Sequence, residues 1–234
     1  MSTIKRDARR AGLLYLLLAF VGPFNQLYLP GRYIVSGNAA ETAANLVAGA
    51  TLWRFGAFVG IASNVLFLAV ALSLYALLVG VDRKQARLML ALVGVGVAVG
   101  AVSAVNQVVP LVLLGKAEYL SAFTQAQREA LAMSFLRIQS VGNSIAMAFW
   151  GLWLLPFGAL VIKSRYFPRI IGILLVVGCF AYLALSFTLI VLPTYAGDVN
   201  RVAMPLYAVG EVSMILWLLV KGAREPDAHI AGVG

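Results

Sequence analysis

The chain has 234 residues, of which 62% are hydrophobic and only 12% are charged, and its mean hydropathy is +0.93. A soluble domain typically contains about 45–50% apolar and about 25% charged residues, so this composition excludes an ordinary soluble protein and requires lipid as solvent. The net charge of +9 lies in short loops without a basic, aromatic-interleaved patch, which excludes nucleic acid as a partner.

A membrane-spanning helix needs about 20 mostly apolar residues. Six runs of the chain qualify, at roughly 11–29, 52–80, 88–115, 138–162, 170–193 and 203–220. Basic residues precede the first run as in a signal peptide, but no small-residue cleavage site follows it. We therefore expect the first run to remain as an uncleaved transmembrane helix.

Two segments between the runs are long enough for short helices. In residues 37–50, Asn38 and Glu41 have the spacing of a capping box, and an alanine-rich stretch follows. Residues 121–137 repeat this pattern with Thr124 and Gln127. The sequence thus predicts an all-α integral membrane protein, a bundle of about six transmembrane helices with short amphipathic outer-side helices. Residues 1–222 would form a single domain, and 223–234 a flexible cytoplasmic tail.

The distribution of basic residues predicts the orientation. Twelve lie on one side of the predicted membrane, namely Lys5, Arg6, Arg9, Arg10, Arg83, Lys84, Arg87, Lys163, Arg165, Arg169, Lys221 and Arg224. Six lie on the other side, namely Arg32, Arg54, Lys116, Arg128, Arg137 and Arg201. Because the richer side is usually cytoplasmic, we expect a multi-pass protein of the cell inner (cytoplasmic) membrane with both termini in the cytoplasm.

Polar side chains inside the spans gather in the predicted outer half of the bilayer. Glu211 is the only acidic residue well inside a span, eight residues past Ala203. At about 1.5 Å per residue, it lies about 12 Å below the outer surface. Since intramembrane polar groups usually pair or line a cavity, we predict an outer-half polar pocket. Its candidate ligand-binding residues are Glu211, Asn64, Gln107, Gln139, Asn143, Arg54 and Arg137.

The same residues also have a structural interpretation. Gly56 and Gly60 share a helical stripe with Asn64, and Gly96 and Gly100 share one with Gln107. Such stripes favour close helix packing, and the amides would then be interhelical hydrogen-bond partners. The two arginines would extend to lipid head groups. Glu211 would pair with an arginine or be protonated, and these alternatives stay open at the level of sequence.

Histidine and cysteine restrict the chemistry of the membrane domain. The single histidine, His229, lies in the polar tail, so a histidine-based zinc or haem site and Ser-His catalysis are excluded from the spans. The single cysteine, Cys179, lies in an apolar run and is typical of a packing residue. We expect no metal and no cofactor.

Several stretches resemble a known family. They are Thr42–Leu46, Leu52–Gly56, Phe135–Arg137, Lys163–Arg169, Gly210–Glu211 and Leu216–Gly222. Together and in this order, they resemble a bacterial membrane-protein family catalogued as domain of unknown function 4386. The resemblance implies a helical membrane protein without an assigned activity, and it favours Arg54, Gln139 and Glu211 as positions of interest.

The chain departs from this family pattern in two places. Members often carry a histidine at the position of Gln139, and many carry an acidic residue near the position of Gly60. If those groups perform proton or metal chemistry in relatives, this chain has lost it. The departures therefore argue against a catalytic role.

Three functions remain in competition. The chain would bind or transport a small or lipid-like ligand, with Glu211 contacting a cation, proton or hydroxyl. Alternatively, it would be a membrane enzyme on an isoprenoid or lipid substrate, with Glu211 as general acid or base. As a third alternative, it would be a regulatory or structural partner that acts through helix packing. The bilayer is the expected partner in each case, and an oligomer is left open.

Overall fold

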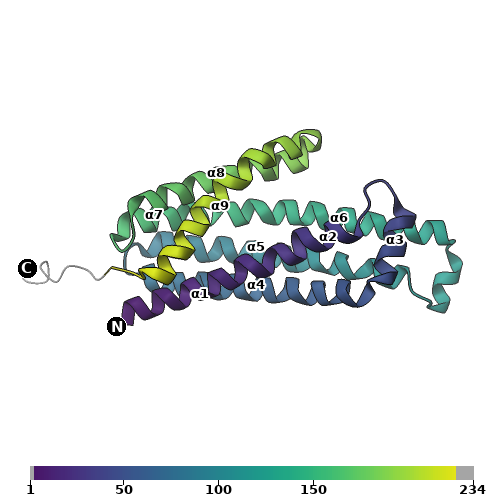
Figure 1. Ribbon diagram of the computed structural model, residues 1–234, viewed down its shortest axis with the longest axis horizontal. Coiled ribbons are helices and arrows are strands. Elements are labelled where there is room, and N and C mark those ends of the chain that lie inside the picture. Colours follow the sequence, from purple (N-terminus) through teal and green to yellow (C-terminus); the bar gives the residue numbers. More distant parts are fainter. Residues whose placement is uncertain (1–2, 225–234) are drawn as a thin grey trace, which may run out of the picture. The chain divides into compact units, whose positions relative to one another are not determined.

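The computed structural model describes residues 3–224, and these are helical with no strand among them (Figure 1). Six helical stretches of this part of the chain are long and apolar enough to cross a membrane. The predicted all-α fold with six spans is therefore confirmed. The predicted tail at 223–234 lies, apart from its first two residues, outside the described residues.

Each of the six stretches overlaps one predicted apolar run. Their bounds are Thr3–Tyr33, Ala50–Leu78, Arg83–Leu113, Gln125–Ser164, Arg169–Val191 and Pro193–Val220. The first contains α1 (Thr3–Pro23), a π-helical segment η1 (Phe24–Tyr28) and α2 (Leu29–Tyr33). The next two are α4 (Ala50–Leu78) and α5 (Arg83–Leu113). The fourth joins α6 (Gln125–Leu152) to α7 (Leu154–Ser164). The fifth is α8 (Arg169–Val191), and the last contains the short η3 (Pro193–Tyr195) and α9 (Ala196–Val220).

Proline explains two irregular places in these spans. Pro156 has no N–H for the carbonyl of Leu152, four residues earlier, and the break between α6 and α7 falls at Trp153. Pro23 and Pro30 lie on either side of the π-helical η1, where the regular hydrogen-bond ladder is interrupted in the same way. Both irregularities therefore follow from missing backbone donors.

The described residues divide into two compact units. Unit 1 comprises residues 3–16, 67–96 and 147–224, and unit 2 comprises residues 17–66 and 97–146. The helices α1, α4, α5 and α6 each contribute residues to both units, whereas α7, α8 and α9 belong to unit 1 alone.

In unit 1, α8 and α9 form a hairpin through η3 and run side by side (Figure 1). Ala181, Leu185 and Ala203 form a buried apolar cluster between them. Glycines permit close packing of α7 against α8 as well: a Cβ at Gly158 would lie 2.6 Å from the carbonyl oxygen of Gly172. Small residues thus replace bulky side chains wherever these helices approach most closely.

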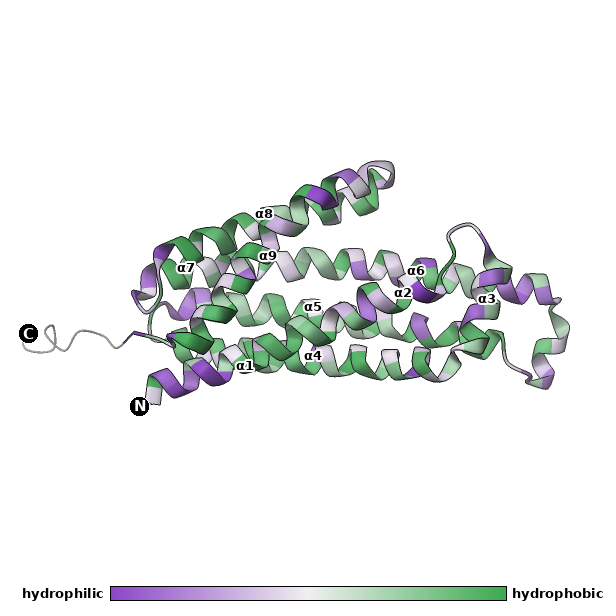
Figure 2. Cartoon of the chain, viewed as in Figure 1, coloured by the Kyte–Doolittle hydropathy of each residue, from purple (hydrophilic) through white to green (hydrophobic). Residues whose placement is uncertain are grey.

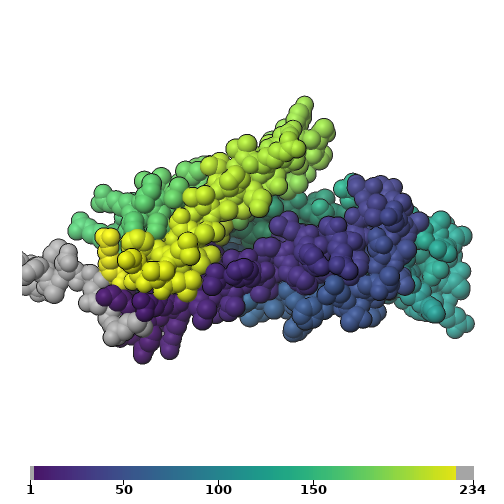
Figure 3. All heavy atoms as spheres, viewed as in Figure 1, coloured from purple at the N-terminus to yellow at the C-terminus, as the bar shows by residue number. Residues whose placement is uncertain are grey.

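The first and last described segments meet in unit 1. The Arg9 guanidinium donates a hydrogen bond to the carbonyl of Val220 at 3.2 Å. A Cβ at Gly12 would lie 2.8 Å from the Cβ of Leu218, so α1 and α9 pack tightly. Figure 3 shows the yellow C-terminal end of α9 against the purple N-terminal turns of α1. Both ends of the described chain therefore lie at the same end of this unit.

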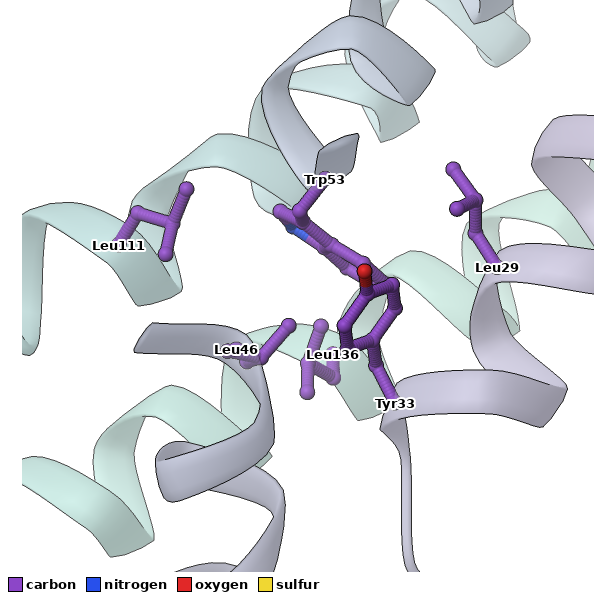
Figure 4. Packing of buried hydrophobic residues seen from close by; sticks show 6 residues of the cluster. All are labelled: Leu29, Tyr33, Leu46, Trp53, Leu111 and Leu136. Atoms are coloured by element: carbon purple, nitrogen blue, oxygen red, sulfur yellow. The ribbon is translucent and has the colours of Figure 1, made fainter. Parts of the chain in front are cut away.

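Unit 2 has an aromatic core of its own. Trp53 of α4 is 1% exposed and lies among Leu29, Tyr33, Leu46 and Leu136 (Figure 4). The rings of Trp53 and Tyr33 meet edge to face, with centroids 5.8 Å apart. This core fixes α2 and the short α3 (Ala39–Ala48) against the long helices of the unit.

Both predicted capping boxes are confirmed, but they begin helices of different lengths. Asn38 accepts a hydrogen bond from the N–H of Glu41 and begins α3, the predicted short helix. Thr124 accepts one from the N–H of Gln127, and the Gln127 side chain accepts one from the N–H of Thr124. The second box begins α6, which continues into a span, so residues 121–137 do not form a separate short helix. The helix continues because no proline follows the second box before Pro156. Only a short 3₁₀ turn, Glu118–Ala122, precedes α6.

The surface of the described chain is largely apolar. Figure 2 shows hydrophobic residues along the middle of the long helices and hydrophilic residues mainly near their ends. Large side chains such as Phe20 and Val102 are 72% and 71% exposed. In water such a surface would drive aggregation, whereas in a bilayer it contacts lipid chains. The protein is therefore a multi-pass membrane protein.

An ion pair in unit 1 connects the loop between α4 and α5 to the end of α7. Lys163 Nζ lies 2.8 Å from Asp82 Oδ2, and the N–H groups of Lys84 and Gln85 donate to Asp82 Oδ1 at 3.1 Å. The hydrogen bond from Lys163 is the main cause that lowers the pKa of Asp82, and the bond from the Gln85 N–H adds to it.

This pKa shift predicts a pH dependence. A carboxylate whose pKa is lowered by folding stabilises the folded state above its unfolded pKa, and this stabilisation is lost as the pH falls through the folded pKa. We expect Asp82→Asn to remove this acidic component from the pH profile of the thermal unfolding temperature in detergent. Asp7→Asn is the control, because Asp7 is exposed and lies 3.9 Å from the guanidinium of Arg10. Identical profiles for the wild type and Asp82→Asn would contradict the prediction.

Candidate functional site

Glu211 lies at a junction of three helices in unit 1. Its carboxylate on α9 accepts one hydrogen bond from the hydroxyl of Tyr15 on α1 at 2.5 Å and one from the hydroxyl of Tyr182 on α8 at 2.8 Å. Each tyrosine binds a different carboxylate oxygen. Tyr15 is buried, while Glu211 and Tyr182 are half-buried. The carboxylate is thus held in a defined orientation inside a membrane-spanning segment.

Aromatic rings surround this carboxylate. Tyr207 lies one turn before Glu211 on α9, and its ring stacks on that of Tyr182, with centroids 4.0 Å apart and an interplanar angle of 16°. The ring of Tyr15 packs against Trp153 at 5.9 Å. We call Glu211, Tyr15, Tyr182 and Tyr207 the Glu211 cluster. Tyrosine rings and a carboxylate are both groups that attract a cation.

Glycines bring the Glu211 cluster together. A Cβ at Gly210 would lie 2.8 Å from the backbone oxygen of Leu174 on α8, and one at Gly178 would lie 3.2 Å from the Cα of Tyr207. With no side chain at either position, α9 lies close enough to α8 for the Tyr182 hydroxyl to reach Glu211. The hydrogen-bond geometry of the site therefore depends on helix packing as well as on the polar residues themselves.

Glu211 has no basic partner among the described residues of its own unit. Within unit 1, the carboxylate contacts two hydroxyl groups and no arginine or lysine. Hydroxyl donors orient a carboxylate but carry no positive charge, and an uncompensated charge in lipid is costly. A proton or a bound cation would complete the site, which gives it the chemistry of a cation-binding or proton-binding position.

A second polar group lies in unit 2. The side chains of Gln107 and Asn25 pair reciprocally, at 2.7 Å and 3.3 Å, and Gln139 donates to the side-chain oxygen of Gln107 at 3.2 Å. Trp53 donates its ring N–H to the backbone oxygen of Gln107 at 2.7 Å. We call Asn25, Gln107 and Gln139 the amide cluster. Gln107 is 1% exposed and all its partners come from other helices, so this cluster joins helices.

The predicted glycine stripes do face other helices. A Cβ at Gly60 would lie 2.5 Å from the side-chain nitrogen of Asn25, and one at Gly100 would lie 3.1 Å from the side-chain oxygen of Asn64. Each stripe therefore makes room for an amide from a neighbouring helix. This packing role of the glycines is confirmed.

Four predicted site residues form no side-chain hydrogen bond or ion pair with a described residue of unit 2. Asn64 and Asn143 are half-buried, and their side chains make no hydrogen bond within residues 3–224. Arg54 and Arg137 are exposed on unit 2, and neither forms an ion pair with a described residue of that unit. Because these arginines belong to unit 2 and Glu211 belongs to unit 1, an ion pair between Glu211 and either of them stays a prediction.

The structure brings together part of the predicted site. Gln107 and Gln139 bind each other, whereas Glu211 belongs to unit 1 and the other six candidates belong to unit 2. A single pocket formed by all seven residues therefore stays a prediction.

The sequence did not predict Tyr15 and Tyr182 as partners of Glu211. The available signal was chemical, because a buried tyrosine hydroxyl usually finds a hydrogen-bond partner and Glu211 is the acidic residue well inside a span.

Comparison with known proteins gives one match. A family model described as Domain of unknown function (DUF4386) matches residues 10–222, which is most of the chain and includes every residue of both polar clusters. No curated protein and no solved structure matches the chain. With six apolar spans and a family match over nearly its whole length, the chain belongs to the DUF4386 family of multi-pass membrane proteins.

Proposed function

We propose that this protein binds or transports a small or lipid-like ligand that presents a cationic or hydroxyl group to Glu211. One observation carries the proposal: the Glu211 carboxylate is half-buried in a span, is oriented by two tyrosine hydroxyls and has no basic partner among the described residues of unit 1. An intramembrane carboxylate of this kind is expected to serve a ligand or a proton.

Two other interpretations of Glu211 compete with ligand binding. In the structural one, Glu211 pairs with an arginine or is a protonated carboxyl held by hydrogen bonds; its tyrosine contacts fit the protonated form, which the binding test with Glu211→Gln distinguishes from a ligand site. In the catalytic one, a general acid or base normally works with a second titratable group, and the groups that bond to Glu211 in unit 1 are two tyrosine hydroxyls.

We also infer that the protein lies in the cell inner membrane with both termini in the cytoplasm. Two observations support this orientation: the basic residues concentrate on one side, and Arg9 near the start of the chain contacts Val220 near its end. Reporters that are active only in the cytoplasm, fused to either terminus, should both be active. A reporter that is inactive at one terminus would contradict the inferred orientation.

Binding at Glu211 can be tested with Glu211→Gln, which keeps the size of the side chain but removes its charge and replaces one acceptor oxygen with an NH2 donor. The purified protein would be screened by thermal unfolding against quaternary ammonium compounds, primary amines and long-chain alcohols. We expect one of these classes to stabilise the wild type and to bind Glu211→Gln about tenfold or more weakly, since charge-assisted contacts are the strong ones.

Matched variants separate this effect from general damage. Asp198→Asn removes an acidic residue from the same helix, but Asp198 is exposed and contacts only Arg201, so ligand binding should not change. Tyr15→Phe and Tyr182→Phe each remove one donor to the carboxylate and should weaken binding less than Glu211→Gln does. Equal ligand binding by Glu211→Gln and the wild type would refute the proposed function.

A further inference from the structure

A cavity opens in unit 2 between α2 and α3. Its volume is about 440 Å³, and it is lined by Arg32, Tyr33, Asn45, Ala48 and Gly49. A volume of this order falls in the range of about 300–1,000 Å³ that is usual for small-ligand sites. The cavity contains neither Glu211 nor any other residue of the Glu211 cluster or of the amide cluster. It is therefore a separate candidate site.

The cavity presents an arginine that has donors to spare. Arg32 is exposed, one of its nitrogens donates to the hydroxyl of Tyr28 at 3.1 Å, and its guanidinium lies 5.8 Å from the centre of the Tyr33 ring. No carboxylate within the described residues pairs with it, and Glu41 of α3 is bonded to Asn38. A guanidinium has five N–H donors, so most of those of Arg32 remain available.

The other walls add polarity without negative charge. The Asn45 side-chain nitrogen donates one N–H to the backbone oxygen of Tyr33 at 3.4 Å and has a second N–H that can donate to an anion. Gly49 leaves room for the Tyr33 ring, because a Cβ at this position would overlap that ring. The resulting combination of one guanidinium, one amide and no carboxylate favours an anion.

The position of the cavity near the end of a span favours a phosphate group as the anion. Arg32 is the second-last residue of the span Thr3–Tyr33, so it lies where hydrocarbon gives way to polar surroundings. The adjoining α3 carries buried Thr42, Ala43 and Leu46 on one face and exposed Glu41 on another, as an interfacial helix does. Lipid phosphates lie at this level of a bilayer, and planar guanidinium groups bind phosphate through paired hydrogen bonds.

We propose that this cavity binds a phosphate group, with the Arg32 guanidinium as its principal contact and Asn45 beside it. A phospholipid head group and a soluble phosphate share this chemistry. The charge pattern places Arg32 on the predicted outer side of the membrane, whereas the proposal itself depends only on the cavity and its residues. It is also independent of the function proposed for Glu211.

The test uses the full-length protein in detergent with three probes: phosphatidylglycerol, phosphatidylcholine and inorganic phosphate. Native mass spectrometry counts bound lipid, and thermal unfolding reports stabilisation by each probe. We expect phosphatidylglycerol to bind the wild type in preference to phosphatidylcholine, and Arg32→Gln to weaken this binding about tenfold. Lys116→Gln is the control, because Lys116 is an exposed basic residue of the same unit that does not line the cavity.

The outcomes separate the two phosphate sources. Stabilisation by phosphatidylglycerol alone, lost in Arg32→Gln, supports a lipid head group. Equal stabilisation by inorganic phosphate, again lost in Arg32→Gln, supports a soluble phosphate at the same site. Asn45→Ala should weaken either response, which checks the cavity without altering charge. If all variants bind the probes as the wild type does, or if no probe binds the wild type, the proposal is overturned.

Discussion

Replacement of Trp53 by alanine is expected to lower the free energy of unfolding by about 3–5 kcal/mol, the usual range for truncating a large buried aromatic side chain. Trp53 is 1% exposed, lies in the aromatic core of unit 2 and donates a hydrogen bond to the backbone of Gln107. Its loss would open a cavity beside Tyr33 and leave a buried carbonyl without that donor. Denaturant titration in detergent micelles, followed by circular dichroism, measures the change.

Trp53→Phe separates the two contributions. Phenylalanine keeps an aromatic ring next to Tyr33 but has no N–H for the carbonyl of Gln107. Because interhelical hydrogen bonds in membranes contribute about 0.6 kcal/mol on average, we expect most of the loss to be restored, with a deficit of about 1 kcal/mol. If Trp53→Ala unfolded at the same denaturant concentration as the wild type, Trp53 would not be the centre of this core.

Gly210→Ala is the second change with a large expected effect. The added Cβ would lie 2.8 Å from the backbone oxygen of Leu174, and a backbone atom of a packed helix cannot rotate away as a side chain can. The helices α8 and α9 would have to separate, at a cost of about 1–3 kcal/mol typical of overpacking. Because Glu211 is the next residue, its hydrogen bond from Tyr182 on α8 should be lost as well.

The matched control is Gly197→Ala on the same helix. A Cβ at Gly197 meets nothing within 4 Å, and alanine favours helix over glycine, so this variant should be as stable as the wild type or slightly more stable. Thermal unfolding of both variants, with and without a ligand of Glu211, measures stability and site geometry together. Equal stability of Gly210→Ala and Gly197→Ala would contradict the close contact between α8 and α9.

The spans were predictable because they depend on composition within short windows. Lipid requires about 20 consecutive apolar residues per helix, so the runs at 52–80 and 88–115 predict α4 and α5 to within a few residues. The capping boxes at Asn38 and Thr124 were predictable for the same reason, since each involves residues three positions apart. What the second box did not indicate was the length of the helix that follows it.

The partners of Glu211 could not be predicted in this way. Tyr15 and Tyr182 lie 196 and 29 residues from it in sequence, and local patterns contain no information about such distant pairs. Gln107 and Gln139 were predicted as site residues from their depth, and the structure shows them bonded to each other, with Gln107 also bonded to Asn25 and Trp53. The depth of a polar side chain along its helix was predictable from the sequence. Which neighbouring helix it faces depends on glycines of other helices, where the close packing occurs.

The contact between α1 and α9 has a consequence for biosynthesis. Tyr15 enters the membrane with the first span, but its partner Glu211 is 196 residues further along the chain. At about 5–20 residues per second, the ribosome needs about 10–40 s to reach it. During that interval α1 occupies the bilayer with its Tyr15 hydroxyl and Gly12 surface uncovered. The first helix to be inserted is therefore among the last to reach its final packing, and a chain stalled before α9 would leave it open to other membrane proteins.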